Sequence, residues 1–301
     1  MENTNSILSK TTDIVKEGFN GVSELMPCGV IIQIGKKGLD IFTYLLDNHI
    51  ALSLEEYTVN QAVDDQQLWK GIEEVFSRHS LLSNPLSFNS ISVSFKSDIF
   101  THLPSEIYDF ESDDYFLQNT QKLASGSAIF TDWLEEQNVY LVWAVQQVWI
   151  DKLSHLLPMH QIRPSHQLTP LILMSLAIHD PSKSLRIFAH FENDYFLVWV
   201  LKGNRLLFAN SFDYHFANDA VYFLQFVFQE HKLSPFEDTL HLMGDILAIS
   251  KVHEVLVKYF GEIEFVPKSG QFAFGPEFDS LLWHRYHDIF SIYLLNTKHT
   301  H

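Results

Sequence analysis

The first half of the chain begins with apolar runs separated by short polar turns. Residues that favour β-structure predict three strands, at about 28–34, 38–46 and 50–57. Five residues then follow at helical spacing and predict one buried helix face: Leu68, Ile72, Val75, Phe76 and His79. Further on, residues 138–145 ("NVYLVWAV") predict a buried strand that precedes another helix. A short strand near residues 159–164 completes this half.

The second half repeats this order. Strands are predicted near residues 185–191, 194–201 and 204–212, and a helix starts at Asn218. The next strand ends at Gly244, and a helix and a last strand follow it. Each half therefore reads as β-β-β-α-β-α-β.

The turns repeat as well. Asp47-Asn48 and Gly203-Asn204 each join two strand-like runs, and Asn48 and Asn204 are 156 residues apart, about half of the 301-residue chain. The repeated turns and the repeated order of elements together predict an α/β fold built by duplication.

Breaks in the pattern give the expected domains. Residues 1–26 are polar and predict a short helix or a loose leader. Residues 27–165 form the first half, and residues 166–301 form the second half with a C-terminal helix from Pro276. Residues 84–135 match nothing in the second half and are predicted to be an insertion, which is where family-specific features often lie.

A strongly apolar helix is expected between the halves. Residues 171–178 ("LILMSLAI") are apolar on nearly every side. Thr169 as N-cap and Pro170 at the first helical position predict where this helix begins.

Composition and charge exclude several functions. The chain has 37 acidic and 20 basic residues, a formal net charge of −17, and one adjacent basic pair, Lys36-Lys37, so nucleic-acid binding is not expected. No apolar run is long enough to span a bilayer, and no export signal is recognisable, so no membrane association is expected. The single cysteine, Cys28, cannot form an intrachain disulfide, which fits a reducing cytoplasm.

The order of elements resembles the duplicated ribonuclease-H-like fold of actin, sugar kinases and the 70-kDa chaperones. More specifically, residues 186–229 ("RIFAHFENDYFLVWV" to "FLQFVFQ") with residues 240–246 ("LHLMGDI") resemble a bacterial family of unknown function with an actin-like fold. This resemblance covers most of residues 27–267 and is strongest in the second half. It implies an actin-like ATPase fold of two ribonuclease-H-like halves and almost nothing about activity.

The resemblance also implies where a nucleotide site would lie. Active members of the superfamily carry an Asp-x-Gly turn after the first strand, in which glycine admits a phosphate and Asp orients magnesium or water. Here that turn is Gln33-Ile34-Gly35, and a neutral amide cannot act as a general base. The second phosphate turn, Phe191-Glu192-Asn193-Asp194, has no glycine, and the adenosine loop, Met243-Gly244-Asp245, keeps one.

We expect six residues to converge around one cleft as a degenerate nucleotide site: Gln33, Gly35, Asn193, Asp194, Gly244 and Asp245. The degraded motifs predict a cytoplasmic, non-enzymatic protein-interaction module with an unidentified protein partner, no catalytic residue, no cofactor and no metal. The alternatives are an ATP-binding or phosphotransfer enzyme that uses ATP with magnesium, and a metal-dependent nuclease. His284, His287 and Asp288 have the helical spacing of metal ligands, but no further ligand of known spacing lies nearby. The oligomeric state is left open.

Overall fold

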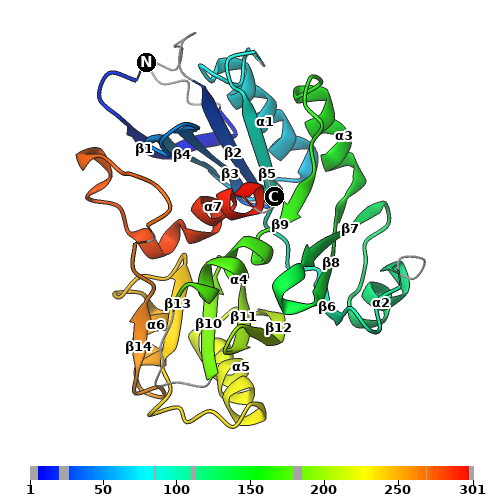
Figure 1. Ribbon diagram of the computed structural model, residues 1–301, viewed down its shortest axis with the longest axis vertical. Helices are drawn as coiled ribbons and strands as arrows, with labels where there is room; N and C mark the ends of the chain where they lie inside the picture. Colours follow the sequence, from blue (N-terminus) through cyan, green and yellow to red (C-terminus); the bar gives the residue numbers. More distant parts are fainter. Residues whose placement is uncertain are drawn as a thin grey trace.

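The structure is a computed structural model that describes residues 6–19, 27–84, 86–109, 113–178, 185–268 and 270–297. Two large sheets dominate it, one in each half of the chain (Figure 1). The strands of the first sheet are, in spatial order, β1 (Leu8–Val15), β4 (Ala51–Val59), β3 (Gly38–Leu45), β2 (Cys28–Gly35), β5 (Ser90–Phe95) and β9 (Pro164–His166). Those of the second are β12 (Arg205–Asp213), β11 (Tyr195–Lys202), β10 (Leu185–Phe191), β13 (Leu240–Gly244) and β14 (Ile263–Phe265).

Apart from β1, the two sheets have the same strand order and directions. In each half three strands form an antiparallel meander, and two further strands add in parallel beside the first strand of the meander. This shared order agrees with the repeat in the sequence. The sequence repeat further predicts that the two halves superpose, with strand 28–34 on strand 185–191, that is, β2 on β10.

Helices cover the sheets. One face of the first sheet packs against α1 (Asp65–Arg78) and α3 (Gln147–Leu156), and the second sheet packs against α5 (Ala217–Glu230) and α6 (Lys251–Leu256). Helix α4 (Leu168–Leu176) is buried along nearly its whole length, and its core includes residues of both sheets, as expected for a helix between the halves.

The apolar surfaces of the predicted helices also predict that five side chains are buried, and four of them are: Trp149, Leu153, Leu224 and Leu256. The fifth, Phe223, is only partly buried and stacks on Phe212.

The start of the fold differs from the sequence-based expectation. Residues 8–15 form strand β1, which pairs antiparallel with β4, so a short helix or loose leader is the wrong prediction for this part of residues 1–26. Its burial alternates only weakly because β1 lies at the edge of the sheet and most of its side chains face solvent. A polar edge strand of this kind has no strong hydrophobic signature.

The fourth strand of the first sheet is also misplaced by the sequence pattern. It is β5 (Ser90–Phe95), which lies inside the predicted insertion, and not residues 138–145. Serines alternate with apolar residues in β5, which is the period of a strand, but the segment matches no sequence in the second half and is therefore predicted as part of the insertion. Strand β8 (Val139–Gln146) is instead the middle of a separate sheet, between β6 (Phe100–Pro104) and β7 (Ser127–Leu134). The added region thus begins after β5 and includes β8.

This third sheet and α2 (Asp113–Thr120) form a side unit (Figure 1), and a 3-10 helix (Glu135–Gln137) joins β7 to β8. The unit contacts both halves. The Ser211 hydroxyl of β12 donates to the Asp98 carbonyl at 2.6 Å, beside the start of β6. The Asp132 carboxylate of β7 accepts hydrogen bonds from the His166 amide at 2.9 Å and the Thr169 hydroxyl at 2.5 Å. The Asp132 carboxylate therefore accepts the hydrogen bonds at the N-terminus of α4. Thr169 lies inside the helix, so the predicted N-cap is wrong.

The C-terminal segment returns from the second half to the first (Figure 1). The predicted continuous helix from Pro276 is wrong: the segment consists of 3-10 helices at Pro276–Phe278 and Trp283–Arg285, then α7 (His287–Ser291) and α8 (Tyr293–Thr297). Its aromatic side chains pack on the face of the first sheet opposite α1, around Phe42 and Tyr44. Residues 270–297 are called the tail below. The tail covers the sheet face that looks toward the second half.

Candidate functional site

One row of polar residues crosses the entire first sheet. The row takes one residue from each of the six strands, in register: Thr12, Glu56, Asp40, Gln33, Ser94 and Ser165. Two residues along β2, β3 and β4, on the same face, the apolar side chains of Ile31, Phe42 and Leu54 contact the tail. The face around this row is apolar and covered by the tail. The charged side chains of the row, Glu56 and Asp40, therefore lie at the boundary between the two halves.

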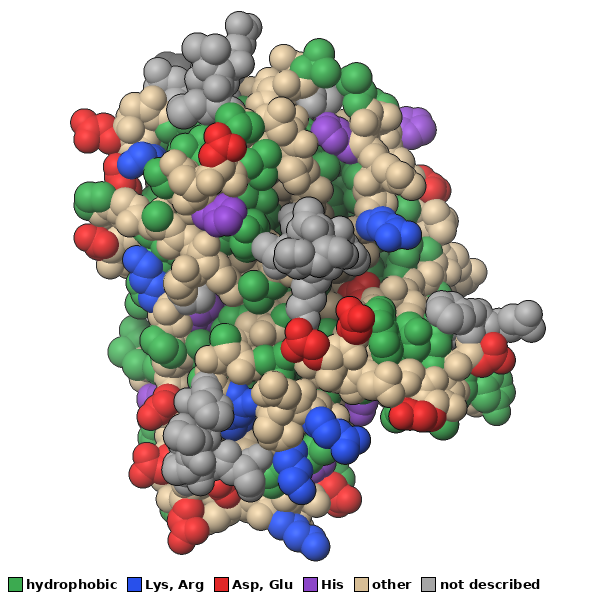
Figure 2. Space-filling model, viewed as in Figure 1, with side chains coloured by type: hydrophobic (Ala, Val, Ile, Leu, Met, Phe, Trp, Pro, Cys, Tyr) green, Lys and Arg blue, Asp and Glu red, His purple; other side chains and the backbone are tan. Residues whose placement is uncertain are grey.

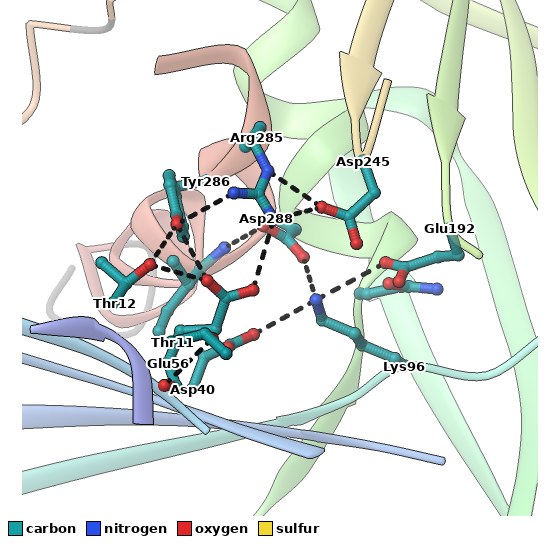
Figure 3. Close-up of polar contacts among 12 residues, drawn as sticks. Thr11, Thr12, Asp40, Glu56, Lys96, Glu192, Asp245, Arg285, Tyr286 and Asp288 are labelled. Carbon is teal, nitrogen blue, oxygen red and sulfur yellow. Dashed lines mark hydrogen bonds and ion pairs between the residues drawn. The ribbon is translucent and has the colours of Figure 1, made fainter. Parts of the chain in front are cut away.

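Lys96, directly after β5, is the centre of this boundary (Figure 3). Its ammonium lies 3.1 Å from the Asp40 carboxylate of β3, 3.1 Å from the Asp288 carboxylate of α7 and 3.6 Å from the Glu192 carboxylate. Glu192 follows β10 in the second half. One lysine thereby connects the first sheet, the tail and the second half.

The pKa shifts follow from this crowding of charge. Burial raises the pKa of Asp40 to about 7; Asp288 and Glu56 add to the rise, and Lys96 opposes it. Burial alone would lower the pKa of Lys96, but the surrounding carboxylates, Asp288 first, raise it well above its ordinary value. Burial likewise opposes ionisation of Asp288, and the charges of Lys96 and His190 lower its pKa nevertheless.

Arg285 makes a second bridge beside the first. Its guanidinium contacts the Asp245 carboxylate at 2.6 Å and the Glu56 carboxylate at 3.3 Å, so it links the loop after β13 to β4 (Figure 3). Glu56 also accepts hydrogen bonds from the hydroxyls of Thr12 at 2.7 Å and Tyr286 at 3.0 Å. The half-buried Glu56 thus has partners on β1 and on the tail.

The two hairpin turns face each other across the cleft. The Lys37 ammonium, in the turn after β2, lies 3.9 Å from the Asp194 carboxylate in the turn after β10. The pocket between the turns has a volume of about 50 Å³. A wider groove of about 870 Å³ adjoins it, and the two share Lys37, Asp194 and Asp245 among their lining residues.

The structure brings four of the six predicted site residues together. Gly35, Asn193, Asp194 and Asp245 line the small pocket. Gln33 is fully buried in β2, is not among the lining residues, and its amide has no hydrogen-bond partner within the described ranges. Whether this place is a degenerate nucleotide site stays a prediction.

The two glycines of the predicted site serve packing. A Cβ added to Gly35 would lie 3.0 Å from the Cβ of Lys96, so the space above the glycine is filled by the lysine side chain. Gly244 is not among the lining residues of the pocket; it has a φ of +82°, and a Cβ there would lie 2.1 Å from the Phe191 carbonyl oxygen. Close approach of β10 and β13 therefore explains Gly244 without a nucleoside.

The predicted metal candidates do not share a site. The His284 and His287 rings are turned to the carbonyls of Ile246 at 2.8 Å and Val266 at 3.2 Å. A different group, His190, Glu192 and Asp288, has ligand-type atoms within 4.8 Å of one another. However, the Lys96 ammonium and the His190 ring already contact both carboxylates of that group. The positive charge that a metal ion would bring is supplied there by Lys96.

A second buried charged cluster lies on the other face of the first sheet. Glu55 accepts hydrogen bonds from Tyr57 at 2.6 Å and His79 at 3.0 Å and pairs with Lys10 at 2.7 Å. Burial works against it, but these bonds, that of His79 first, lower the pKa of Glu55 to about 2. The other His79 nitrogen accepts from the backbone amides that follow it. No ring nitrogen of His79 is left to take a proton from a substrate, so this cluster is structural.

Sequence reasoning missed Lys96, Asp40, Glu192 and Arg285. Lone charged residues inside or at the end of apolar strands were the available signal, as in "LDIF" around Asp40. Their partners are far apart in sequence, so only the fold identifies them.

Comparison with solved structures identifies the class of fold. A Bacteroides thetaiotaomicron protein with an actin-like ATPase fold and unknown function matches with a TM-score of 0.72 and 21% identity, over 80% of this chain and 91% of that one. A type IV pilus biogenesis complex of PilM and PilN matches with a TM-score of 0.56 and 14% identity, over 90% and 97% of the two chains. The chain therefore has the actin-like ATPase fold, as the order of its elements predicted.

The family follows from the sequence. The model of the family described as "Protein of unknown function (DUF3822)" matches residues 21–263, and the chain belongs to this family. The resemblance noted above is thereby confirmed. None of the curated proteins compared with the chain matches it.

Proposed function

We propose that this protein is a non-enzymatic, actin-like protein-interaction module whose cleft is held together by its own charged side chains. The observation that carries the proposal is the position of Lys96. Its ammonium lies among three carboxylates from three parts of the fold, and its side chain fills the space over Gly35. Related enzymes would place phosphate and magnesium beside that glycine.

Charge and space both disfavour a triphosphate. The small pocket of about 50 Å³ is far below the roughly 300–1,000 Å³ typical of ligand pockets. Asp40, Glu192 and Asp194 line it, and their charges would repel an anion. Gln33 cannot supply the missing carboxylate, because its amide is neutral, and it is buried outside the lining of the pocket.

Several features support a protein partner. Large apolar side chains are exposed on the second half, among them Phe216, Tyr222 and Phe226 at α5. One of the similar structures is a complex of PilM with PilN, so another protein with this fold takes part in a protein complex. On the face that Figure 2 shows, acidic and basic side chains are scattered among polar and apolar ones. That distribution and the charge of −17 speak against a nucleic-acid partner.

The proposed location is the cytoplasm. Cys28 is buried, and burial raises the pKa of its thiol, so it behaves as a small apolar side chain. Within the described part of the chain, no helix combines the length and apolar character needed to cross a membrane.

The alternative is an ATP-binding or phosphotransfer enzyme with unusual site residues. One observation favours it: the groove of about 870 Å³ is large enough for a nucleotide and is lined by Lys36, Lys37 and Arg285. In our proposal two of these cations already have close carboxylate partners, Lys36 at Asp98 and Arg285 at Asp245, and Lys37 lies 3.9 Å from Asp194.

Thermal unfolding with and without magnesium-ATP separates the two functions. A ligand present at one hundred times its dissociation constant stabilises the folded state by about 2.7 kcal/mol. We expect no shift of the melting temperature with millimolar magnesium-ATP relative to magnesium alone. A rise of several degrees that depends on ATP would favour the enzyme.

A further inference from the structure

The cleft carries more negative than positive charge. Its interior contains two cations and five carboxylates, with histidines taken as neutral: Lys96 and Arg285 against Asp40, Glu56, Glu192, Asp245 and Asp288. The rim pairs Lys36–Asp98 and Lys37–Asp194 add no net charge. An excess of three negative charges remains, or of two with His190 charged. Such a cleft should attract a further cation.

The shape of the cleft indicates what kind of cation. The pocket of about 50 Å³ has room for a few water molecules, or for one ammonium or guanidinium group. It adjoins the groove of about 870 Å³, and Glu56, Asp194 and Asp245 line both. A bound group in the pocket could therefore belong to a longer molecule in the groove.

The groove wall suits a polypeptide. Six consecutive residues, 58–63, form one side, and they include the apolar Val59 and Val63 and the amide Gln61. Leu247 adds an apolar contact from the second half. Thr58 and Val59 already pair with neighbouring strands, so an extended chain would bind this wall through its side chains and not as an added strand.

The Asp194 carboxylate pairs only weakly with Lys37 and is open to a closer cationic partner. Its side chain is about half exposed, and its distance of 3.9 Å to Lys37 exceeds the 2.7–2.9 Å of a good charge-assisted hydrogen bond. A free metal ion is a poorer fit, since the Lys96 ammonium already lies beside one oxygen of Glu192 and one oxygen of Asp288.

We infer that the groove binds an extended segment of a partner protein and that this segment places a Lys or Arg side chain in the pocket between the hairpin turns. The inference rests on the proposed function and names the chemistry of the partner.

Selection from a displayed library of random dodecapeptides, with the full chain as bait, tests this inference. Enriched peptides are then synthesised and titrated into the wild type and three variants. We expect a Lys or Arg at a shared position, and at least tenfold weaker binding when that residue is replaced by Gln. Asp194→Asn and Ala62→Trp, which alter the pocket rim and the groove wall, should weaken binding at least tenfold. Raising the salt should weaken it as well, because the contact is between charges.

Asp13→Asn is the matched control. Asp13 lines a pocket of about 560 Å³ on the other face of the sheet, is about half exposed, and has one lysine partner at 3.2 Å, much like Asp194. Binding should be unchanged in this variant. No enrichment, enrichment of acidic peptides, or equal binding by Ala62→Trp would overturn the inference.

Competition distinguishes this inference from the proposed function. Magnesium-ATP should not displace the peptides, and magnesium chloride alone should do no more than an equal ionic strength of sodium chloride. If no peptide binds and magnesium-ATP does not bind either, the docking inference fails while the non-enzymatic function stands. If peptides bind and magnesium-ATP displaces them, the non-enzymatic function fails, whereas the peptide-binding groove stands.

Discussion

Replacement of Lys96 by methionine tests how much the cleft depends on its internal cation. Methionine keeps an unbranched, flexible side chain that can fill the space over Gly35, but it removes the ammonium. Asp40, Asp288 and Glu192 would then face one another with only His190 nearby. Two of these carboxylates lie 3.1 Å from the ammonium in the wild type, so their loss of a partner is large.

The magnitude follows from the burial of the partners. Exposed fractions are 13%, 2% and 10% for the side chains of Asp40, Asp288 and Glu192. Removing one partner of a buried ion pair costs about 3–5 kcal/mol, since the remaining charge is left uncompensated. At roughly 2–4 °C per kcal/mol for a chain of this size class, we expect the melting temperature to fall by about 10 °C at pH 8. The loss should be smaller at pH 6, where Asp40 takes up a proton.

Thermal and urea unfolding at both pH values measure the effect. Lys251→Met is the control, because Lys251 pairs with Glu254 on the surface, with side-chain exposures of 71% and 55%. An exposed pair of this kind contributes at most about 1 kcal/mol. If Lys96→Met is no more destabilising than Lys251→Met, or if its cost is independent of pH, the reasoning about the cleft is wrong.

Three further predictions concern the same region. The folded-state pKa of Asp40, about 7, lies above its unfolded value, so its contribution to stability is complete at low pH and is lost as pH rises through 7. Asp40→Asn should therefore remove about 1 kcal/mol of the decline in stability between pH 6 and 8. Thermal unfolding measures this, and an unchanged pH profile would contradict it. Gly244→Ala should destabilise at least twice as much as Gly203→Ala, although both glycines have positive φ, because only Gly244 has backbone within contact of a new Cβ; equal urea midpoints would contradict it. Lys96→Ala should gain a manganese site at His190, Glu192 and Asp288 that the wild type lacks. Electron paramagnetic resonance detects the bound ion, and binding by both proteins would show that Lys96 does not take the place of a metal.

The fold was predictable where hydrophobic periodicity is strong. The meander strands and α5 follow from apolar runs and turn dipeptides, and their bounds agree within one or two residues. The pattern did not show which sheet a strand joins: β5 has a regular strand period but falls within the predicted insertion, and β8 is apolar because it is central in its own sheet. The N-cap prediction at Thr169 also failed, because the carboxylate that accepts hydrogen bonds at the start of α4 belongs to Asp132 on a distant strand.

The cleft was predictable only in outline. The resemblance to actin-like proteins correctly predicted that Gly35, Asn193, Asp194 and Asp245 lie around one pocket, because the order of the strands positions the turns. The identity of the charged centre could not be derived, because Lys96 meets carboxylates from three segments whose pairing depends on the packing of the tail. The same packing explains why a buried Gln33 is not at the pocket.

Isothermal titration of magnesium-ATP into the wild type tests the central claim most directly. Asn193→Trp serves as the blocked control, because Asn193 is exposed and lines both pocket and groove, whereas Gly244→Trp would force a side chain into the Phe191 backbone. The account predicts no saturable heat at micromolar protein and nucleotide concentrations for either protein. Micromolar binding by the wild type that is lost in Asn193→Trp would contradict it and establish a nucleotide site in the cleft.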